Sequence, residues 1–241
     1  IGNYAFSSCT SLTEITIPDS VTEIVGGAFS GCTSLKEITV SPDNKNYVSV
    51  DGVLFTKNMS TLVAYPAGNE RSTYTVPNGV TQIVGSAFSD CTSLSKVQLP
   101  NGLTKIGGSV FAYCTSLKEL TIPDSVTAIG SYAFDYCKRL TEITIPDSVT
   151  EIGNYAFDYC TSLSKVKLPN SLTKIGYSAF YCCTSLTELT IPDSVTEIGM
   201  SAFEGCTSLS KVKLPKNLTG INWGVFSDCK SLAEIVIPDS V

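Results

Sequence analysis

Ten cysteines are the most reactive side chains of a 241-residue chain that contains no histidine. All except Cys182 form one series with steps of 23 residues and a single step of 59: Cys9, Cys32, Cys91, Cys114, Cys137, Cys160, Cys183, Cys206 and Cys229. Without histidine and without a C-x-x-C pair, the spacing gives no support for a zinc site. Stacked repeats would place neighbouring Cα atoms about 4.8 Å apart, a distance that disulfides also tolerate. Because residues in one register cannot all pair, we favour a buried ladder of reduced thiols.

Cys182 lies outside this series, immediately before Cys183. It occupies the register that Tyr113, Tyr136 and Tyr159 hold in the three preceding repeats. We expect that register to face outward, which would make Cys182 an exposed thiol able to crosslink chains or to be modified. A tolerated drift from tyrosine explains the residue equally well.

Carboxylates recur at a single register of the repeat rather than converging on one point. The row consists of Glu14, Glu37, Glu119, Glu142, Glu188 and Glu234, interrupted by Thr73, Lys96, Lys165 and Lys211. Catalysis needs unlike groups brought together, such as a nucleophile, a base and an oxyanion donor. We therefore predict a protein that is not an enzyme, with no catalytic residues, no cofactor and no metal site.

From Glu142 onward this row alternates in charge, which avoids stacking like charges on neighbouring strands. The adjacent row adds Lys167 and Lys213 among threonines. Solubility and cross-strand pairing would explain such a stripe. The alternative is that it recognises a protein on a concave sheet, with these candidate binding residues: Lys165, Lys167, Glu188, Lys211 and Lys213.

Tyrosines gather in the middle repeats, at Tyr113, Tyr132, Tyr136, Tyr155, Tyr159, Tyr177 and Tyr181. Exposed tyrosine is favoured at interfaces because it offers a large contact area at low entropic cost. Tyr132, Tyr136, Tyr155 and Tyr159 form the second candidate binding surface. Outward repeat positions filled by a residue that suits turns would give the same pattern.

The elements that must position these residues come from the 23-residue period, which phenylalanine also follows from Phe88 to Phe226. A period between 20 and 29 with the pattern L-x-x-I-x-I is typical of leucine-rich repeats. Alternation at Ile15 and Ile17 predicts a short strand, and the following proline ends it. We predict a leucine-rich repeat solenoid of about ten coils, each with a short parallel strand, a turn and a short helical or 3-10 segment.

One coil is longer than the others, because 59 residues separate Phe29 from Phe88. Asp51-Gly52 lies between two apolar, alternating runs, which is a strong signal for a two-residue β-hairpin. We expect a single domain over residues 1–241 with a hairpin-containing insertion at 41–71, and a hairpin that projects from the solenoid.

The pattern C-T-S-L-x-x-I-x-I-P-x-S-V-T-x-I-G-x-x-A-F, with the inserted D-G-V-L-F and L-V-A-Y-P, resembles the BspA-like leucine-rich repeats of bacterial and protist surface proteins. The resemblance covers the whole chain. It implies an exported or surface-attached protein that binds host or neighbouring-cell proteins, including matrix proteins. It assigns no site residues.

Net charge −6 without a run of Lys or Arg lacks the electrostatic footprint of a nucleic-acid binder. No apolar run approaches the roughly 18 to 20 residues that span a bilayer, so we expect no membrane insertion within this segment. The sequence begins and stops partway through a repeat, so we interpret it as a piece of a longer protein. Apolar residues at such ends, among them Phe6 and Ile237, predict weak end-to-end association.

Two functions fit these observations. The first is a non-enzymatic, surface-exposed adhesion or protein-binding module, since a solenoid varies its outward positions while keeping its core. The second is a structural spacer or stalk with no ligand of its own, which the near-identical repeats favour.

Overall fold

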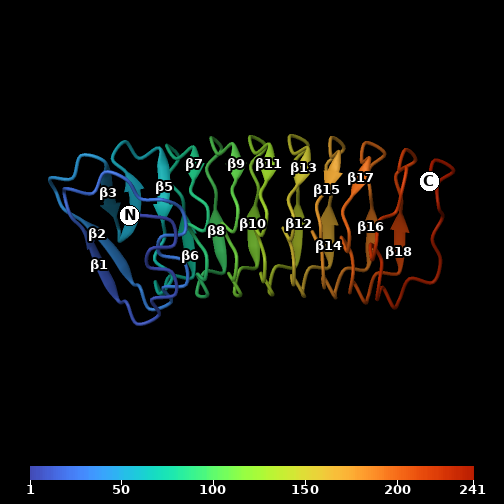
Figure 1. Cartoon of the computed structure of the whole chain (residues 1–241), viewed down its shortest axis with the longest axis horizontal. Coiled ribbons are helices and arrows are strands. Elements are labelled where there is room, and N and C mark those ends of the chain that lie inside the picture. Colours follow the sequence, from blue (N-terminus) through green and yellow to red (C-terminus); the bar gives the residue numbers. More distant parts are fainter.

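The chain stacks its repeats along one axis into an elongated solenoid, with the two termini at opposite ends (Figure 1). The computed structural model describes all 241 residues. It contains 18 strands joined by turns, and no helix. The fold is the predicted leucine-rich repeat solenoid, but the expectation of a short helical or 3-10 segment in each coil is wrong.

The first ladder consists of the short strands that the repeat pattern predicts, which pair in four separate groups. Its nine strands are β1 (Glu14–Ile17), β2 (Glu37–Val40), β6 (Thr73–Thr75), β8 (Lys96–Gln98), β10 (Glu119–Thr121), β12 (Glu142–Thr144), β14 (Lys165–Lys167), β16 (Glu188–Thr190) and β18 (Lys211–Lys213). Paired strands are parallel, so that Lys96 faces Glu119 in the next coil. The last repeat, from residue 234 to 237, has no assigned strand. The ladder therefore has nine strands where about ten coils were expected.

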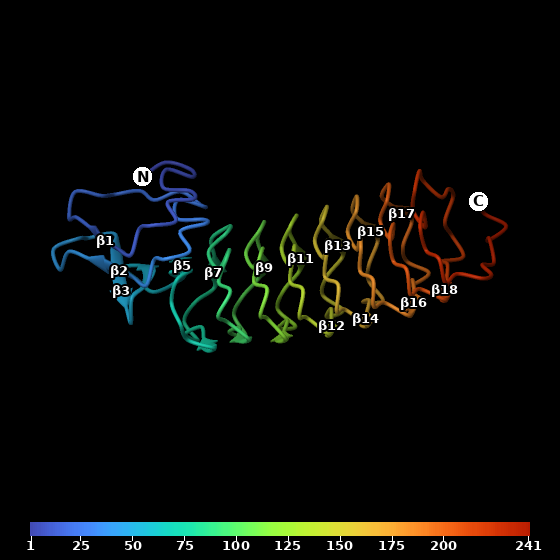
Figure 2. The same ribbon diagram turned by 90° about the horizontal axis from the view of Figure 1, so that it is seen from below.

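A second ladder follows after a proline-started turn, in which the Val126 N–H donates to the Pro123 carbonyl at 3.0 Å. It consists of β7 (Gln82–Ile83), β9 (Lys105–Ile106), β11 (Ala128–Ile129), β13 (Glu151–Ile152), β15 (Lys174–Ile175) and β17 (Glu197–Ile198). The five strands from β9 to β17 form one parallel sheet. Figure 2 shows the two ladders running along different sides of the coils.

The segment predicted as helical instead forms a third row of inter-coil hydrogen bonds, which we call the turn ladder. The Phe134 N–H donates to the Ala156 carbonyl of the next coil at 2.8 Å, and the Tyr136 N–H donates to Asp158 in the same way. Tyr132 and Tyr136 have φ of 58° and 56°, in the left-handed region. A right-handed helix cannot pass through such residues, and N–H groups that bond to the next coil are not free for helical bonds.

The core is a column of identical side chains. Phenylalanine rings stack at centroid distances of 5.1 to 5.6 Å from Phe88 to Phe226. Tyr65 of the long coil continues the column, 5.2 Å from Phe88. Six of these phenylalanines, from Phe88 to Phe203, are fully buried. Repetition therefore lets a side chain that packs once pack in every coil.

Glycine before the turn ladder is required for close packing, not for backbone conformation. None of Gly130, Gly153 and Gly199 has a positive φ. A Cβ on Gly130 would lie 2.7 Å from the Gly107 carbonyl carbon, and one on Gly153 would lie 2.5 Å from the Ser131 nitrogen. From Gly130 to Gly199 the coils approach so closely at this point that only a residue without a side chain fits, whereas Val25, Val84 and Asn222 occupy the same register in other coils.

The long coil contributes three antiparallel strands, β3 (Tyr47–Val50), β4 (Val53–Thr56) and β5 (Thr61–Ala64). Asp51 and Gly52 connect β3 to β4 with φ of 52° and 81°, the conformation of a type I′ turn. The hairpin does not project, because Ile38 of β2 donates its N–H to Gly52 at 2.9 Å and the whole of Val53–Phe55 has zero exposure. The expectation of a projecting hairpin is wrong.

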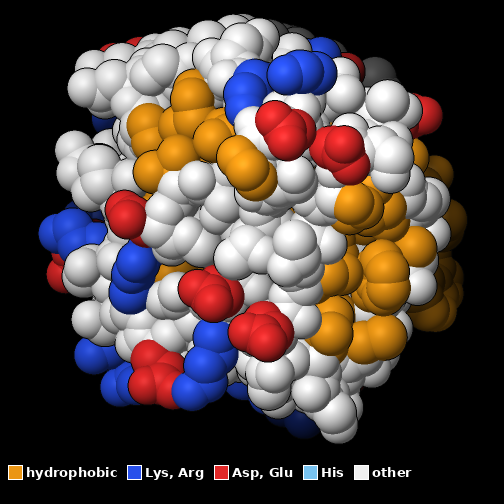
Figure 3. Space-filling view, turned by 90° about the vertical axis from the view of Figure 1, so that its left-hand side faces the viewer, with side chains coloured by type: hydrophobic (Ala, Val, Ile, Leu, Met, Phe, Trp, Pro, Cys, Tyr) orange, Lys and Arg blue, Asp and Glu red, His pale blue; other side chains and the backbone are white.

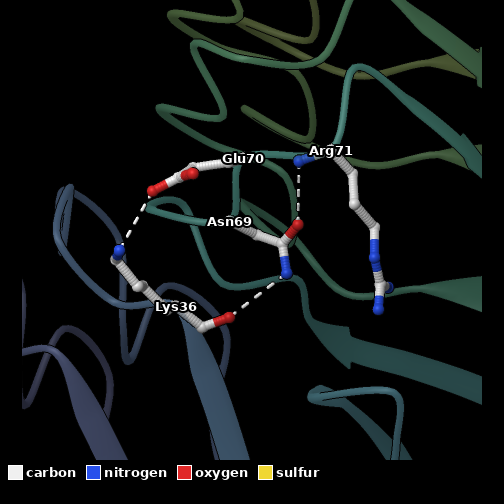
Figure 4. Close-up of polar contacts among 4 residues, drawn as sticks. All are labelled: Lys36, Asn69, Glu70 and Arg71. Atoms are coloured by element: carbon white, nitrogen blue, oxygen red, sulfur yellow. Dashed lines mark hydrogen bonds and ion pairs between the residues drawn. The ribbon is translucent and has the colours of Figure 1, made fainter.

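A short segment after β5, residues 68–71, which we call the Asn69 strap, connects the long coil to the preceding one (Figure 4). Lys36 contacts this strap twice, through its ammonium 3.0 Å from a Glu70 carboxylate oxygen and through its carbonyl, which accepts from the Asn69 amide at 3.2 Å. The Asn69 side chain also accepts from the Arg71 N–H. Gly68 donates to the Leu35 carbonyl at 2.8 Å, and a Cβ on Gly68 would lie 2.4 Å from the Ser34 backbone.

The insertion divides the hydrophobic core. A cluster of 55 buried residues runs from the long coil to the C-terminal end, and a separate cluster of 11 lies beside β1 and β2. Strands β1 and β2 are inclined relative to the upright strands that follow them (Figure 1). Hydrophobic side chains gather in patches on the end of the molecule that carries these strands (Figure 3).

We expect Gly153→Ala to destabilise the fold by about 1–3 kcal/mol, because the new methyl group would force neighbouring coils apart. Gly79→Ala is the matched control, since its Cβ would meet nothing within 4 Å. Urea unfolding followed by circular dichroism measures both. Equal stability of the two variants would contradict this explanation of the glycine.

Candidate functional site

The first ladder brings together the residues of the predicted charge stripe, which are Lys165, Lys167, Glu188, Lys211 and Lys213. Lys165 and Lys167 lie on β14, Glu188 on β16 and the other two on β18, and every one is exposed. Glu188 faces Lys211 in register. Alternation along the strand explains the exposure, since the intervening valine or leucine turns into the core.

All five residues of the charge stripe line one shallow hollow of about 600 Å³. Four lysines and one glutamate give this hollow a formal charge of +3 on a chain whose net charge is −6. None of the five forms an ion pair within 4 Å, whereas Lys96 and Glu119 on β8 and β10 lie 2.8 Å apart. Their charges therefore remain directed to solvent.

The tyrosine candidates lie on the turn ladder and form two separate columns. The long stack consists of Tyr113, Tyr136 and Tyr159, with ring centroids 4.9 and 4.7 Å apart. The short stack consists of Tyr132 and Tyr155, 4.8 Å apart and nearly parallel. The sequence grouped the four candidate tyrosines as one cluster, but the structure divides them two and two.

Left-handed backbone conformations set the direction of both stacks. All five stacked tyrosines have φ between 51° and 60°. Such a conformation costs a residue other than glycine roughly 1–2 kcal/mol, and the inter-coil hydrogen bonds of the turn ladder offset this. In the other repeats the same two registers carry serine, aspartate, cysteine or glycine, apart from Tyr4 in the first repeat.

Two aspartates that sequence analysis did not single out lie between the stacked tyrosines along the chain, Asp135 and Asp158, which we call the aspartate pair. Asp135 is 6% exposed, and one carboxylate oxygen of each residue is buried without a hydrogen-bond partner. Burial, followed by the charge of Asp158, raises the pKa of Asp135 to about 7. Burial also raises the pKa of Asp158 to about 6. The sequence did contain a signal for this pair, because no other repeat has aspartate at this register.

A protein-family model matches this chain. The model described as BspA type leucine-rich repeat region matches residues 1–140 and 127–241, and so the whole chain. This chain belongs to the BspA-type leucine-rich repeat family. The sequence-based resemblance is therefore confirmed. A comparison with curated proteins found no match.

Crystal structures of bacterial leucine-rich repeat proteins share the fold. A protein from Eubacterium ventriosum is 30% identical, with a TM-score of 0.66, over 96% of this chain and 56% of its own. The pneumococcal vaccine antigen PcpA is 26% identical, with a TM-score of 0.68, over 84% and 56%. A leucine rich cell surface protein from Faecalibacterium prausnitzii is 34% identical, with a TM-score of 0.54, over 65% and 48%. The BspA-type chain thus spans about half the length of these relatives.

The cysteines of this BspA-type solenoid are free thiols with a repeated partner. The Cys137 thiol donates to the Phe111 carbonyl at 3.2 Å, and the same bond recurs along the core from Cys114 to Cys229. Burial raises the pKa of Cys137, Cys160 and Cys183, which suppresses the reactive thiolate.

The two cysteines outside the buried ladder differ from expectation. Cys182 is half-buried at φ 53°, in the register of the long stack, and burial raises its pKa. Cys9, expected to be buried with the others, is exposed because no coil packs on its outer side in this structure. The prediction that every thiol except Cys182 is buried is therefore wrong for Cys9.

No group of three or more potential metal ligands occurs in the structure. It also has no helix with the length and hydrophobicity that a bilayer crossing requires.

A maleimide reagent applied to the native protein should label Cys9 quickly and Cys182 slowly, and the other eight thiols only after unfolding. The exposure of the thiols sets this order, and burial also raises the pKa of Cys182. Mass spectrometry of peptides after timed quenching measures it. Rapid labelling of Cys137 in the native state would contradict a buried ladder.

The aspartate pair should make the fold less stable as the pH rises. Both carboxyls have a higher pKa in the folded protein than the ordinary 3.8, so the folded state binds protons more tightly. The stabilisation from protonation is complete below about pH 4 and is lost as the pH rises through about 7. We expect the double variant D135N/D158N to lose this part of the pH dependence of Tm.

Asp43→Asn serves as the control, because Asp43 is exposed and outside the pair. Thermal unfolding between pH 4 and 8 compares the three proteins. An unchanged pH profile in the double variant would show that the aspartate pair does not titrate in this range.

Proposed function

We propose that this chain is a non-enzymatic, surface-exposed protein-binding module, and that the charge stripe is its principal binding surface. Membership in a family of repeat proteins supports the general role, as does similarity to a protein described as a leucine rich cell surface protein. The observation that carries the proposal is the single hollow that all five residues of the stripe line. The repeats place similar side chains in rows and do not bring a nucleophile, a base and an oxyanion donor together, which favours binding over catalysis.

The chemistry of the stripe favours an acidic segment of a partner protein. Its lysines are exposed and have no ion-pair partner, so they retain their charge for an incoming carboxylate. Exposed charge pairs contribute little affinity each, but several in one hollow add orientation and speed to the encounter. Threonine and asparagine around the rim, Thr187 and Asn170 among them, offer neutral hydrogen-bonding groups.

Binding to matrix and cell-surface proteins immobilised as a panel tests this function. Replacing Lys165, Lys167, Lys211 and Lys213 by serine should weaken binding of any captured protein about tenfold or more at physiological salt. The wild-type affinity should fall steeply as salt rises, because exposed charges are screened beyond about 8 Å. Biolayer interferometry across a salt series measures both effects.

The matched control replaces four exposed lysines outside the stripe, Lys45, Lys57, Lys105 and Lys118, and so changes the net charge equally. A second variant replaces Tyr132, Tyr136, Tyr155 and Tyr159 by serine. Loss of binding in the control equal to that in the stripe variant would refute the assignment of the hollow. Loss only in the tyrosine variant, without salt dependence, would move the binding surface to the turn ladder.

A structural spacer is the second candidate, and the uniformity of the solenoid favours it. The core column and the thiol bonds repeat with almost no change from Phe88 onward. A stalk needs such regularity and needs no ligand. A panel that captures nothing at high micromolar concentration would favour the spacer over the binding module.

A further inference from the structure

One register of the turn ladder changes its residue type along the solenoid. In the earlier coils it carries only small or polar residues, which are Asn3, Gly26, Gly85, Gly108, Ser131 and Asn154. In the next three coils it carries Tyr177, Met200 and Trp223, which we call the apolar row. Stacking does not demand these large side chains, because the earlier coils stack without them.

Backbone hydrogen bonds place the apolar row on successive rungs of the turn ladder. The Tyr155 N–H donates to the Tyr177 carbonyl at 2.8 Å. The equivalent bonds to the Met200 and Trp223 carbonyls follow in the next two coils, at 3.0 and 2.9 Å. Since neighbouring rungs are about 4.8 Å apart, Tyr177 and Trp223 are separated by about 10 Å along the solenoid axis.

The side chains of the apolar row are open to solvent. Tyr177 and Met200 are each 45% exposed, and Trp223 is 75% exposed. Neither aromatic ring belongs to the phenylalanine column or to the two tyrosine stacks, so no other ring covers its face. Large apolar side chains that gather on a surface are typical of binding sites.

A surface hollow of about 220 Å³ adjoins the apolar row, with Tyr177 in its wall, and we call it the glycine hollow. It lies over β13, β15 and β17 and the glycines that follow these strands. Its charged side chains are Glu151, Lys174 and Glu197, which together give a formal charge of −1. Lys174 pairs with Glu197 at 2.9 Å. The glycine hollow is thus nearly neutral, in contrast to the charge stripe.

Asn154 connects the glycine hollow to the apolar row. Its side-chain oxygen accepts from the Tyr177 N–H at 2.9 Å, which leaves its amide hydrogens to donate elsewhere. Glu151 forms no ion pair within 4 Å, so its carboxylate is available as an acceptor. Hydrogen-bond donors and acceptors therefore lie beside an exposed aromatic ring.

A sugar ring has the two kinds of surface that this arrangement matches. Its C–H face is apolar and packs on aromatic side chains, whereas its hydroxyl groups form hydrogen bonds with carboxylates, amides and ammonium groups. An apolar peptide side chain would need an apolar pocket, and the charged residues of the glycine hollow do not provide one. An ionic ligand would meet charges of both signs there.

We propose that the apolar row and the glycine hollow form a second binding site, which takes an extended, neutral, β-1,4-linked oligosaccharide. In such a chain every second sugar ring turns the same face to one side. Tyr177 and Trp223 lie on alternate coils, about 10 Å apart, so each packs on the like face of one chain that runs along the solenoid axis. The glycine hollow binds hydroxyl groups at the Tyr177 end. This site goes beyond the proposed function, because it shares no residue with the charge stripe.

Fluorescence of Trp223 tests the site directly, because Trp223 is the only tryptophan of the chain. Titration with cellohexaose, chitohexaose and xylohexaose should shift its emission to shorter wavelength for at least one of them, as a sugar ring covers the exposed indole. The α-linked maltohexaose curves and should give no shift at the same concentration. Absence of a shift with all three β-linked chains would overturn the proposal, as would an equal shift with maltohexaose.

The variant Y177S should bind the most effective oligosaccharide about tenfold more weakly, again measured through Trp223. Serine already occupies this register at Ser131, so the variant keeps the fold. Y113S is the matched control, because Tyr113 is 44% exposed but belongs to the long stack, and it should retain the wild-type affinity. Equal affinities of Y177S and Y113S would contradict the assignment of the apolar row.

The glycine hollow is tested by E151A, which removes its unpaired carboxylate and should weaken oligosaccharide binding severalfold. The control E142A removes an exposed carboxylate from β12, on the first ladder, and should have no effect. If E151A binds as tightly as E142A, the hollow takes no part in binding and the proposed site is wrong.

Two other occupants of the apolar row would give different results. A shift of Trp223 emission with protein concentration alone would show that a second copy of the chain covers the row. A shift with phosphatidylcholine vesicles, but with none of the oligosaccharides, would show that the row contacts a lipid surface. Either result would overturn the proposal.

This site and the proposed function can fail separately. Serine at the four stripe lysines should leave the oligosaccharide titration unchanged, whereas Y177S should leave capture of proteins from the panel unchanged. Failure of the panel screen with retained oligosaccharide binding would refute the binding role of the stripe alone. The reverse result would refute the oligosaccharide site alone.

Discussion

Close stacking of backbones at one fixed spacing is the constraint on which the rest of the structure depends. Neighbouring coils are joined by backbone hydrogen bonds of two strand ladders and the turn ladder. The spacing of about 4.8 Å is a property of backbone hydrogen bonding, so side chains must conform to it. Three residue types meet this spacing in different ways. Glycine lies where the backbones touch, phenylalanine stacks in the central column, and cysteine lies beneath the turn ladder.

Periodic residues made the fold predictable. The 23-residue recurrence of Phe134 and Cys137 identified the core, and Asp51-Gly52 identified the turn between β3 and β4. The turn ladder was not predictable in the same way, because left-handed tyrosines are rare and their N–H groups find partners 22 residues further on. Nor could the hairpin be placed, since its burial depends on contact with β2 rather than on its own sequence.

The candidate surfaces, too, were predictable only where they follow from the repeat pattern. Strand alternation was enough to bring the five residues of the charge stripe to one face, and the hollow between them followed from the register. Separating the tyrosines into two stacks required knowledge of backbone direction at Tyr132 and Tyr136. The aspartate pair went unnoticed because a carboxylate on a turn is ordinarily solvated, and here Asp135 is buried.

The divided core has a mechanical consequence. In a solenoid each coil is held only by its neighbours, so resistance to separation varies along the axis with the local interface. The first two coils share a core cluster of 11 residues with the insertion strands β3 to β5, whereas the coils beyond the insertion belong to a cluster of 55. Tension along the long axis therefore concentrates at the boundary between the two clusters, which runs through the long coil. The first two coils would part from the rest there while the continuous column behind them stays intact.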